Sequence, residues 1–248
     1  MHRAVYRGFV FGVAYVVAAA ALPAQTVDEI IARYYQAAGG LDAMKAVHST
    51  RVSGTVTLGP GMDAPFTRLT LRPSLVRVDF TLQGQTATQA YDGEHAWQFM
   101  PFFGQTAPDT MPADIARTMK EESAFDGPLV DFAVRGIQVE LVGKEQVDST
   151  SAYKLKVTMP SGSVTYYYLD VDSYLPIRTE ATRTIQGQSL KIVSTMSDYR
   201  PEGGLMMPHA IDVTQGPGTQ SFVISSVEIN PPLTPADFKM PAKPGGED

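Results

Sequence analysis

Apolar and polar side chains alternate with period two through most of the chain after residue 50, and this pattern constrains its fold more than any other feature. Successive side chains of a strand point to opposite faces of a sheet, so the alternation predicts strands with one buried and one wet face. One stretch alternates between apolar Val76, Val78, Phe80 and Leu82 and polar Arg77, Asp79 and Thr81. The same pattern recurs over residues 51–58, 137–141, 153–159, 164–169, 175–184, 190–199, 205–213 and 222–229.

Short turn sequences separate these runs. They contain Asp92-Gly93, Ser161-Gly162, Gln186-Gly187, Gly203-Gly204 and Gly216-Pro217-Gly218. Such residues adopt the backbone conformations that tight turns require. The chain therefore predicts about ten consecutive strands in an antiparallel meander. A meander of that many strands must curl or close, so we expect a mainly β protein.

Two short helices are expected before the first strand. Apolar residues recur there at spacings of three and four, at Val27, Ile30, Ile31, Tyr34 and Ala38, which indicates an amphipathic helix. Thr26 with Glu29 three residues later is typical of a capping box, and Gly39-Gly40 of a helix end. A second short turn follows, with Leu41, Met44 and Val47 on one side.

One stretch interrupts the meander, from Phe99 to Asp131. Within it, Pro112 suits a first helical turn, and Met111, Ile115 and Met119 recur every four residues. A connection this long inside a compact meander is usually functional or disordered, and its aromatic and methionine content argues against disorder. The last segment, from Asn230 to Asp248, is proline-rich and is expected to be an extended or frayed end.

Residues Met1 to Ala24 have the order of a secretory signal peptide. Arg3 and Arg7 flank an apolar run, and Ala24 offers a small residue for cleavage. A retained membrane anchor is the alternative, but the run is about 15 residues long where a bilayer span needs about 20. We therefore expect export to the periplasm with cleavage near Ala24.

The charge and the cysteine count exclude several classes of function. The net charge is −6, and removal of the signal takes away two arginines and no acids, which makes it −8. That balance argues against nucleic acid as a partner. The absence of cysteine excludes disulfides, thiol catalysis, thiolate metal sites and a lipidated N-terminal cysteine.

No catalytic motif, metal-ligand set or cofactor motif is present in the sequence. The mature chain has only His48, His95 and His209, with no paired histidines at helical spacing. Ser161-Gly162-Ser163 is explained by a hairpin turn, and Asp170 and Asp172 by turn capping. We expect a binding protein without catalytic residues, cofactor or metal.

The sequence resembles the LolA/LolB-like superfamily of lipoprotein carriers, in particular its exported outer-membrane lipoprotein-sorting relatives. Tyr91-Asp92-Gly93-Glu94-His95-Ala96-Trp97 is similar to that family's hairpin with a central tryptophan. Leu169-Asp170-Val171-Asp172-Ser173-Tyr174-Leu175-Pro176-Ile177-Arg178 is similar to its strand, acidic turn and strand restart. Asp237-Phe238 is similar to its closing extended segment. The resemblance spans most of Thr26 to Pro241, and the insertion from Phe99 to Asp131 is larger than in the family.

This resemblance implies an incomplete β-barrel, a strongly curved antiparallel sheet whose concave face is covered by an N-terminal helix and a helical lid. The implied organisation is a signal peptide over 1–24, a half-barrel domain over 25–241 with a helical insertion at about 100–131, and a flexible tail over 242–248. The resemblance also implies an apolar cavity beneath the lid that holds acyl chains of lipoproteins or other lipids. Burial of an acyl chain there contributes about 0.8 kcal/mol per methylene.

We expect the cavity and lid to involve Trp97, Phe99, Met100, Phe102, Phe103, Met111, Ile115 and Met119. For Met100, Met111 and Met119, ligand contact and plain packing are equally compatible with the sequence.

Three functions follow as hypotheses. The first is a periplasmic carrier for acyl chains of lipoproteins or other lipids, with outer-membrane lipoprotein sorting as its setting. The second is a lipid-sensing regulatory domain that acts through an envelope membrane protein. The third is a hydrolase that uses acids such as Asp79, Glu94 or Asp198, and only the presence of carboxylates supports it.

Overall fold

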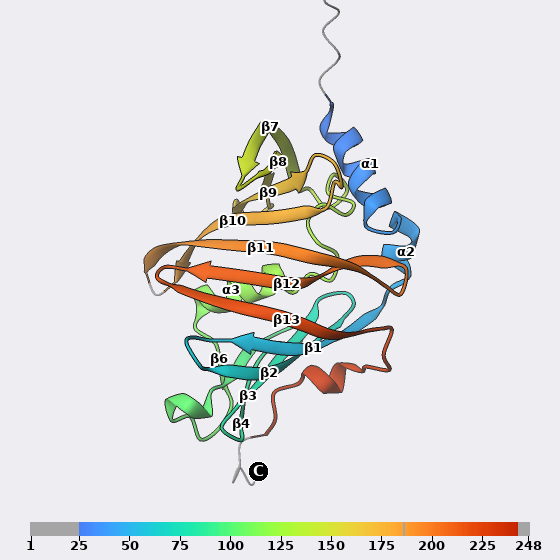
Figure 1. Ribbon diagram of the computed structural model, residues 1–248. Helices are drawn as coiled ribbons and strands as arrows, with labels where there is room; N and C mark the ends of the chain where they lie inside the picture. The colour runs from blue at the N-terminus through green and yellow to red at the C-terminus, as the bar shows by residue number, and fades with distance from the viewer. Residues whose placement is uncertain (1–24, 186, 243–248) are drawn as a thin grey trace, which may run out of the picture.

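The computed structural model describes residues 25–185 and 187–242. The expected signal peptide and nearly all of the expected tail lie outside these residues. Within them, one antiparallel sheet of thirteen strands carries the fold, in the order β6-β5-β4-β3-β2-β1-β13-β12-β11-β10-β9-β8-β7 (Figure 1). The prediction of a mainly β meander is confirmed, with more strands than the ten expected.

The sheet has two halves, one formed by the first six strands of the chain and the other by the last seven. The first half contains β1 (Ser49–Thr57), β2 (Asp63–Leu71), β3 (Leu75–Leu82), β4 (Gln85–Tyr91), β5 (Ala96–Phe99) and β6 (Asp109–Thr110). The second contains β7 (Gln138–Val147), β8 (Thr150–Thr158), β9 (Val164–Asp170), β10 (Pro176–Ile185), β11 (Gln188–Glu202), β12 (Leu205–Gln215) and β13 (Gly218–Ile229). The two halves join where β1 pairs with β13.

Glycine makes that junction possible. The β1–β13 register shifts between Ser53 and Gly54, and a Cβ on Gly54 would lie 2.0 Å from the carbonyl oxygen of Val223. Only a residue without a side chain tolerates this approach of two backbones.

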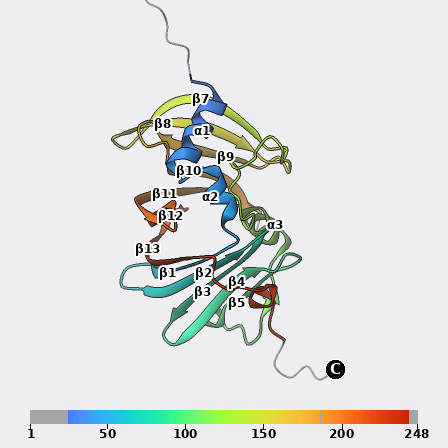
Figure 2. The same ribbon diagram turned by 90° about the vertical axis from the view of Figure 1, so that its right-hand side faces the viewer.

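The sheet does not close, because β6 and β7 occupy its two edges and do not pair with each other. They are nevertheless consecutive along the chain. The connection between them must therefore cross the whole sheet. Figure 2 shows the curvature, with β7–β10 in one arm and β1–β5 in the other. This arrangement confirms the expected incomplete half-barrel.

Three α-helices and two short 3-10 helices accompany the sheet in the described residues: α1 (Val27–Ala37), α2 (Leu41–Ala46), α3 (Ala113–Glu122), η1 (Pro101–Phe103) and η2 (Pro235–Phe238). The capping box of α1 is confirmed, since Thr26 Oγ1 accepts from the Glu29 amide at 3.2 Å and Glu29 Oε2 from the Thr26 amide at 2.9 Å. None of these helices is both long and apolar enough to cross a bilayer.

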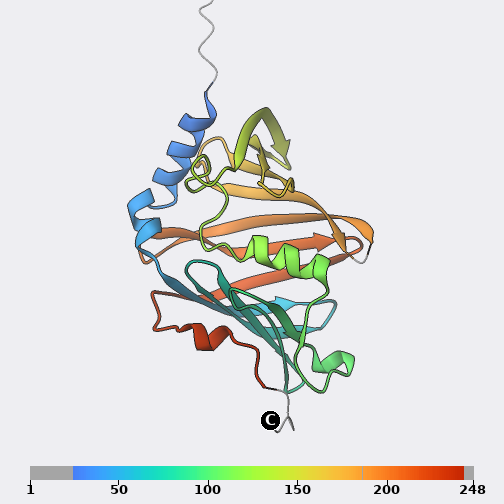
Figure 3. The ribbon, with the colours of Figure 1, turned by 180° about the vertical axis from the view of Figure 1, so that it is seen from behind.

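The helices α1 and α3 mark what we call the inner face of the sheet. Ile30 and Ile31 of α1 are buried in a cluster with Leu155 and Leu169 of β8 and β9. The helix α3 belongs to the connection between the two edges, and it lies behind the sheet in Figure 1 and in front of it in Figure 3. The opposite face is the outer face.

The C-terminal segment packs on the outer face. Phe238 of η2 is fully buried, and its carbonyl accepts from Trp97 Nε1 at 2.8 Å. Asn230 Oδ1 accepts from the amide of His48 at 2.6 Å. The described part of the segment from Asn230 onward is largely extended, as expected, but it is not frayed, because one aromatic side chain anchors it.

Both edges of the sheet are short or irregular. The strand β6 pairs with β5 through only two residues. The register of β7 with β8 shifts between Leu141 and Gly143, and charged side chains follow the strand: Lys156 binds Glu140 at 2.9 Å and Lys154 binds Glu145 at 2.7 Å.

Candidate functional site

The inner face of β1–β3 is mostly apolar. Directly paired residues of neighbouring strands point to the same face, and Val78, which pairs with Arg68, packs against α3. By the same alternation Phe66, which pairs with Phe80, faces inward. Phe66 belongs to a buried cluster with Val52, Val56, Ala64 and Ile224. A concave apolar surface therefore lies beneath α3.

The α3 segment lays its apolar stripe on β3–β5. Met111 is buried with Val76, Tyr91 and Ala96, and Ile115, Ala116 and Met119 pack against this cluster. No residue within α3 itself is fully buried. The stripe is thus a half-buried contact between the connection and the sheet.

A first hollow of about 250 Å³ lies between α1, α2 and the sheet. Its lining is mostly apolar: Tyr34, Ala38, Met44, Val47, Thr50, Thr70, Phe125, Asp126, Gly127, Val130, Leu205, Met206 and Met207. Burial raises the pKa of Tyr34 to about 12, so its hydroxyl stays neutral. Three methionines give this lining an adaptable shape.

A second hollow of about 330 Å³ lies beside the C-terminal end of α3. It is more polar, and its lining is Arg68, Glu121, Glu122, Ala124, Phe125, Asp126, Gly127, Pro128, Arg135, Met159, Thr165, Tyr167 and Arg183. Phe125, Asp126 and Gly127 line both hollows. We call these three residues the partition.

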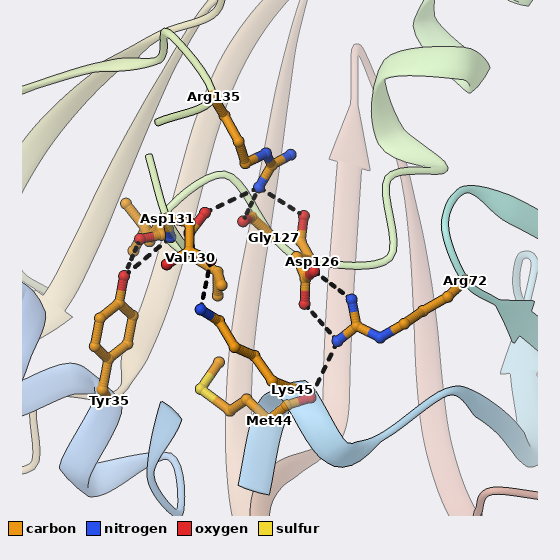
Figure 4. Close-up of polar contacts among 10 residues, drawn as sticks. Tyr35, Met44, Lys45, Arg72, Asp126, Gly127, Val130, Asp131 and Arg135 are labelled. Carbon is orange, nitrogen blue, oxygen red and sulfur yellow. Dashed lines mark hydrogen bonds and ion pairs between the residues drawn. The ribbon is translucent and has the colours of Figure 1, made fainter. Parts of the chain in front are cut away.

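Arg72, in the turn after β2, holds the partition in place (Figure 4). Its guanidinium forms a bidentate ion pair with Asp126, with one Nη2–Oδ1 distance of 2.8 Å. The same side chain donates to the carbonyls of Val47 at 2.6 Å and Met44 at 3.2 Å. Its Cζ lies 4.5 Å from the centre of the Phe125 ring. One arginine thus connects the partition, α2 and the sheet.

A second arginine binds the partition and the loop that follows it. Arg135 Nη1 donates to the carbonyls of Asp126, Gly127 and Val130, at 3.2, 2.8 and 3.1 Å (Figure 4). A partly buried guanidinium with three carbonyl acceptors fixes the shape of this loop.

Helices α1 and α2 bind the same loop. Tyr35 Oη donates to the carbonyl of Leu129 at 2.6 Å and accepts from the amide of Asp131 at 3.3 Å. Lys45 Nζ lies 2.7 Å from Asp131 Oδ2, and this contact raises the pKa of Lys45. The partition is therefore attached to both the helices and the sheet.

The structure brings together some of the residues expected in the cavity and lid. Met111, Ile115 and Met119 meet in the contact between α3 and β3–β5. Phe102 lies against Phe80, with ring centres 6.2 Å apart. Met100 is buried.

Others lie elsewhere. Trp97 and Phe99 lie on the face of β5 opposite to Ala96, and Trp97, 1% exposed, packs beneath η2 on the outer face. Phe103 is 85% exposed to solvent. None of the eight residues expected in the cavity and lid lines either of the two hollows.

No local pattern in the sequence marks Arg72, Asp126 or Arg135 as functional residues. Arg72 and Asp126 are 54 positions apart, and no local pattern links them. Arg68 did carry a signal, since it occupies an inward position of β2 after Ala64 and Phe66, where an apolar residue is expected. In residues 25–185 and 187–242 no three His, Asp or Glu side chains converge as metal ligands.

Comparison by sequence finds no match, neither with a protein-family model nor with a curated protein. Comparison of structures does find similar proteins. A LolA superfamily protein from Nitrosomonas europaea is 14% identical, with a TM-score of 0.57 over 87% of this chain and 98% of the other.

Two further solved structures are comparably similar. A DUF1329 family protein from Desulfovibrio piger is 14% identical, with a TM-score of 0.56 over 86% of this chain and 97% of the other. A candidate outer membrane lipoprotein-sorting protein domain from Vibrio parahaemolyticus is 12% identical, with a TM-score of 0.54 over 85% and 94%.

Proposed function

The chain has the LolA-like fold, and on that premise we propose that it binds and carries acyl chains of lipoproteins or other lipids in the periplasm. The observation that carries this proposal is the first hollow, an apolar space between two helices and a curved sheet. Burial of each methylene there contributes about 0.8 kcal/mol, so affinity for an acyl chain needs no reactive group. The proposed activity is binding rather than catalysis.

The size of the hollows indicates how the site opens. Small-ligand sites typically enclose roughly 300–1,000 Å³, and the first hollow, at about 250 Å³, falls just below that range. A long acyl chain requires more space, which becomes available when α3 or the partition moves. The half-buried stripe of α3 suits an element that detaches at modest cost.

The setting we propose is transfer of lipid or lipoprotein across the periplasm, as in outer-membrane lipoprotein sorting. The similarity to the Vibrio domain supports it at the level of the fold. Donor and acceptor proteins of the envelope are the partners that such a carrier requires.

Lipid that co-purifies with the protein tests this function. We expect mass spectrometry of protein isolated from the periplasm to detect acyl lipids in amounts comparable to the protein. The Ile115→Asp variant, purified identically, should carry much less. Absence of lipid, together with failure to bind a fluorescent fatty acid, would contradict a carrier; a single envelope protein retained at fixed stoichiometry instead would favour the sensor hypothesis.

We also predict that the mature protein begins at Gln25, because a small residue, Ala24, follows the apolar run after Arg7. N-terminal sequencing of periplasmic material measures this directly. An intact Met1 on protein recovered in the membrane fraction would show an anchor instead of a cleaved signal.

A further inference from the structure

Six charged residues line the second hollow, and three of them, Arg68, Arg183 and Glu122, interact with one another there. Arg68 comes from β2, Arg183 from β10 and Glu122 from the last turn of α3. These elements are distant in the sequence, and the crossing of α3 over the inner face brings them together. Arg68 and Glu122 are exposed at the opening of the hollow, whereas the side chain of Arg183 is only 13% exposed.

Arg68 has no such partner among the described residues. It makes no hydrogen bond there and no ion pair within 4.0 Å, and its side chain is open to the hollow. The side chain is also accessible to solvent, so a ligand can reach it. The group is charged, because a guanidinium does not lose its proton in proteins.

Arg183 is partly satisfied. Its Nη atoms donate to the carbonyl of Val164 at 3.3 Å and to Thr165 Oγ1 at 3.1 Å. Its Nε is buried and has no acceptor at hydrogen-bond distance. The nearest anion, Glu122 Oε1, is 3.9 Å away.

The neighbouring acids do not supply the missing acceptors. Glu121 accepts a hydrogen bond from Ser163 at 2.6 Å, and Asp126 is bound by Arg72. Only Glu122 faces the two arginines, and its side chain is 58% exposed. The pair of guanidiniums therefore exceeds its counter-charge by one, with donors left unused.

We propose that the second hollow binds the phosphate of a lipid head group, with Arg68 and Arg183 donating to its oxygens. Guanidinium groups match the planar, bidentate geometry of phosphate better than any other side chain. Glu122 occupies the place of the phosphate in the empty protein and moves aside with the end of α3 when lipid binds. This inference rests on the proposed function, because only the partition separates the head group from the apolar first hollow.

Three ligands distinguish the contribution of the head group to binding affinity from that of the acyl chains. Isothermal titration compares a short-chain phosphatidic acid, the diacylglycerol with the same chains and glycerol 3-phosphate, each against the purified protein. We expect phosphatidic acid to bind at least about tenfold more tightly than diacylglycerol, since each hydrogen bond to a charged group contributes about 1.5–3 kcal/mol. Glycerol 3-phosphate alone should bind far more weakly than phosphatidic acid.

Variants assign the effect to the two arginines. In Arg68→Met and in Arg183→Met, the affinity for phosphatidic acid should fall nearly to that for diacylglycerol, while the affinity for diacylglycerol itself stays unchanged. Arg117→Met, on an exposed position of α3 outside the hollow, is the matched control and should leave the preference unchanged. Glu122→Gln should strengthen phosphatidic acid binding by about threefold or more, because the competing carboxylate is gone. A gain of affinity also cannot result from misfolding.

The outcomes distinguish this inference from the proposed function. Equal binding of the two lipids, with affinity unchanged in the arginine variants, overturns the phosphate site and leaves the carrier intact. Failure of both lipids to bind overturns the carrier itself. If glycerol 3-phosphate binds as tightly as phosphatidic acid, the site recognises a soluble phosphate rather than a lipid head group, and the proposal is overturned. Parallel loss of both lipids in Glu122→Gln shows that Glu122 only positions α3, and this also overturns the proposal.

Discussion

Replacement of Trp97 by alanine is expected to lower the free energy of unfolding by about 3–5 kcal/mol, the usual cost of truncating a fully buried large aromatic side chain. Trp97 is 1% exposed, and its indole N–H binds the carbonyl of Phe238 at 2.8 Å. The change leaves a cavity on the outer face and releases η2. Lipid affinity should stay within about twofold, because the side chain points away from α3.

Urea unfolding followed by circular dichroism measures this effect, since Trp97 is the only tryptophan and its fluorescence is lost with it. Trp97→Phe is the matched control. It keeps an aromatic ring and should cost distinctly less, because mainly the hydrogen bond and part of the packing are lost. Normal stability with abolished lipid binding would instead place Trp97 in the ligand site, as the sequence-based expectation had it.

Ile115→Asp is expected to weaken acyl-chain binding by at least about tenfold, because a carboxylate in the α3 stripe must be desolvated or must hold the helix away from the sheet. Ile115 is only partly buried against Val76 and Tyr91. The free energy of unfolding should therefore fall by only about 1–2 kcal/mol, less than for an unpaired charge in a closed core.

Thermal melting and binding of a fluorescent fatty acid, measured on the same protein, check both parts of this prediction. Arg117→Asp places the same carboxylate on an exposed position of α3 and should change neither quantity substantially. A melting temperature that collapses in Ile115→Asp would make the stripe part of the main core. Unchanged fatty-acid binding would remove α3 from the site.

Local signals in the sequence predicted the elements well. The capping box of Thr26 and Glu29 identified the start of α1, and period-two alternation identified the strands. The stripe of Met111, Ile115 and Met119 identified an amphipathic α3. In each case the physical cause lies within a few residues of the element that it predicts.

The sequence did not predict contacts between distant segments. Nothing in the hairpin around Trp97 shows which face α3 will cover, because Ala96 and Trp97 are both buried, on opposite faces. The partition depends on Arg72 and Asp126, which meet only because the connection after α3 crosses the sheet. The contact that anchors Phe238 was not predicted, since its partner Trp97 lies 141 positions away.

The unclosed sheet has a consequence for how copies of this protein meet one another. An open barrel leaves two strand edges whose free amide and carbonyl groups could template pairing between molecules. Here one edge, β6, is two residues long, and the other, β7, is interrupted at Leu141 and Gly143 and lined with lysine and glutamate. Neither offers the long, flat ladder on which polymerisation depends. The open barrel therefore presents little strand edge at which one copy of the protein could pair with another.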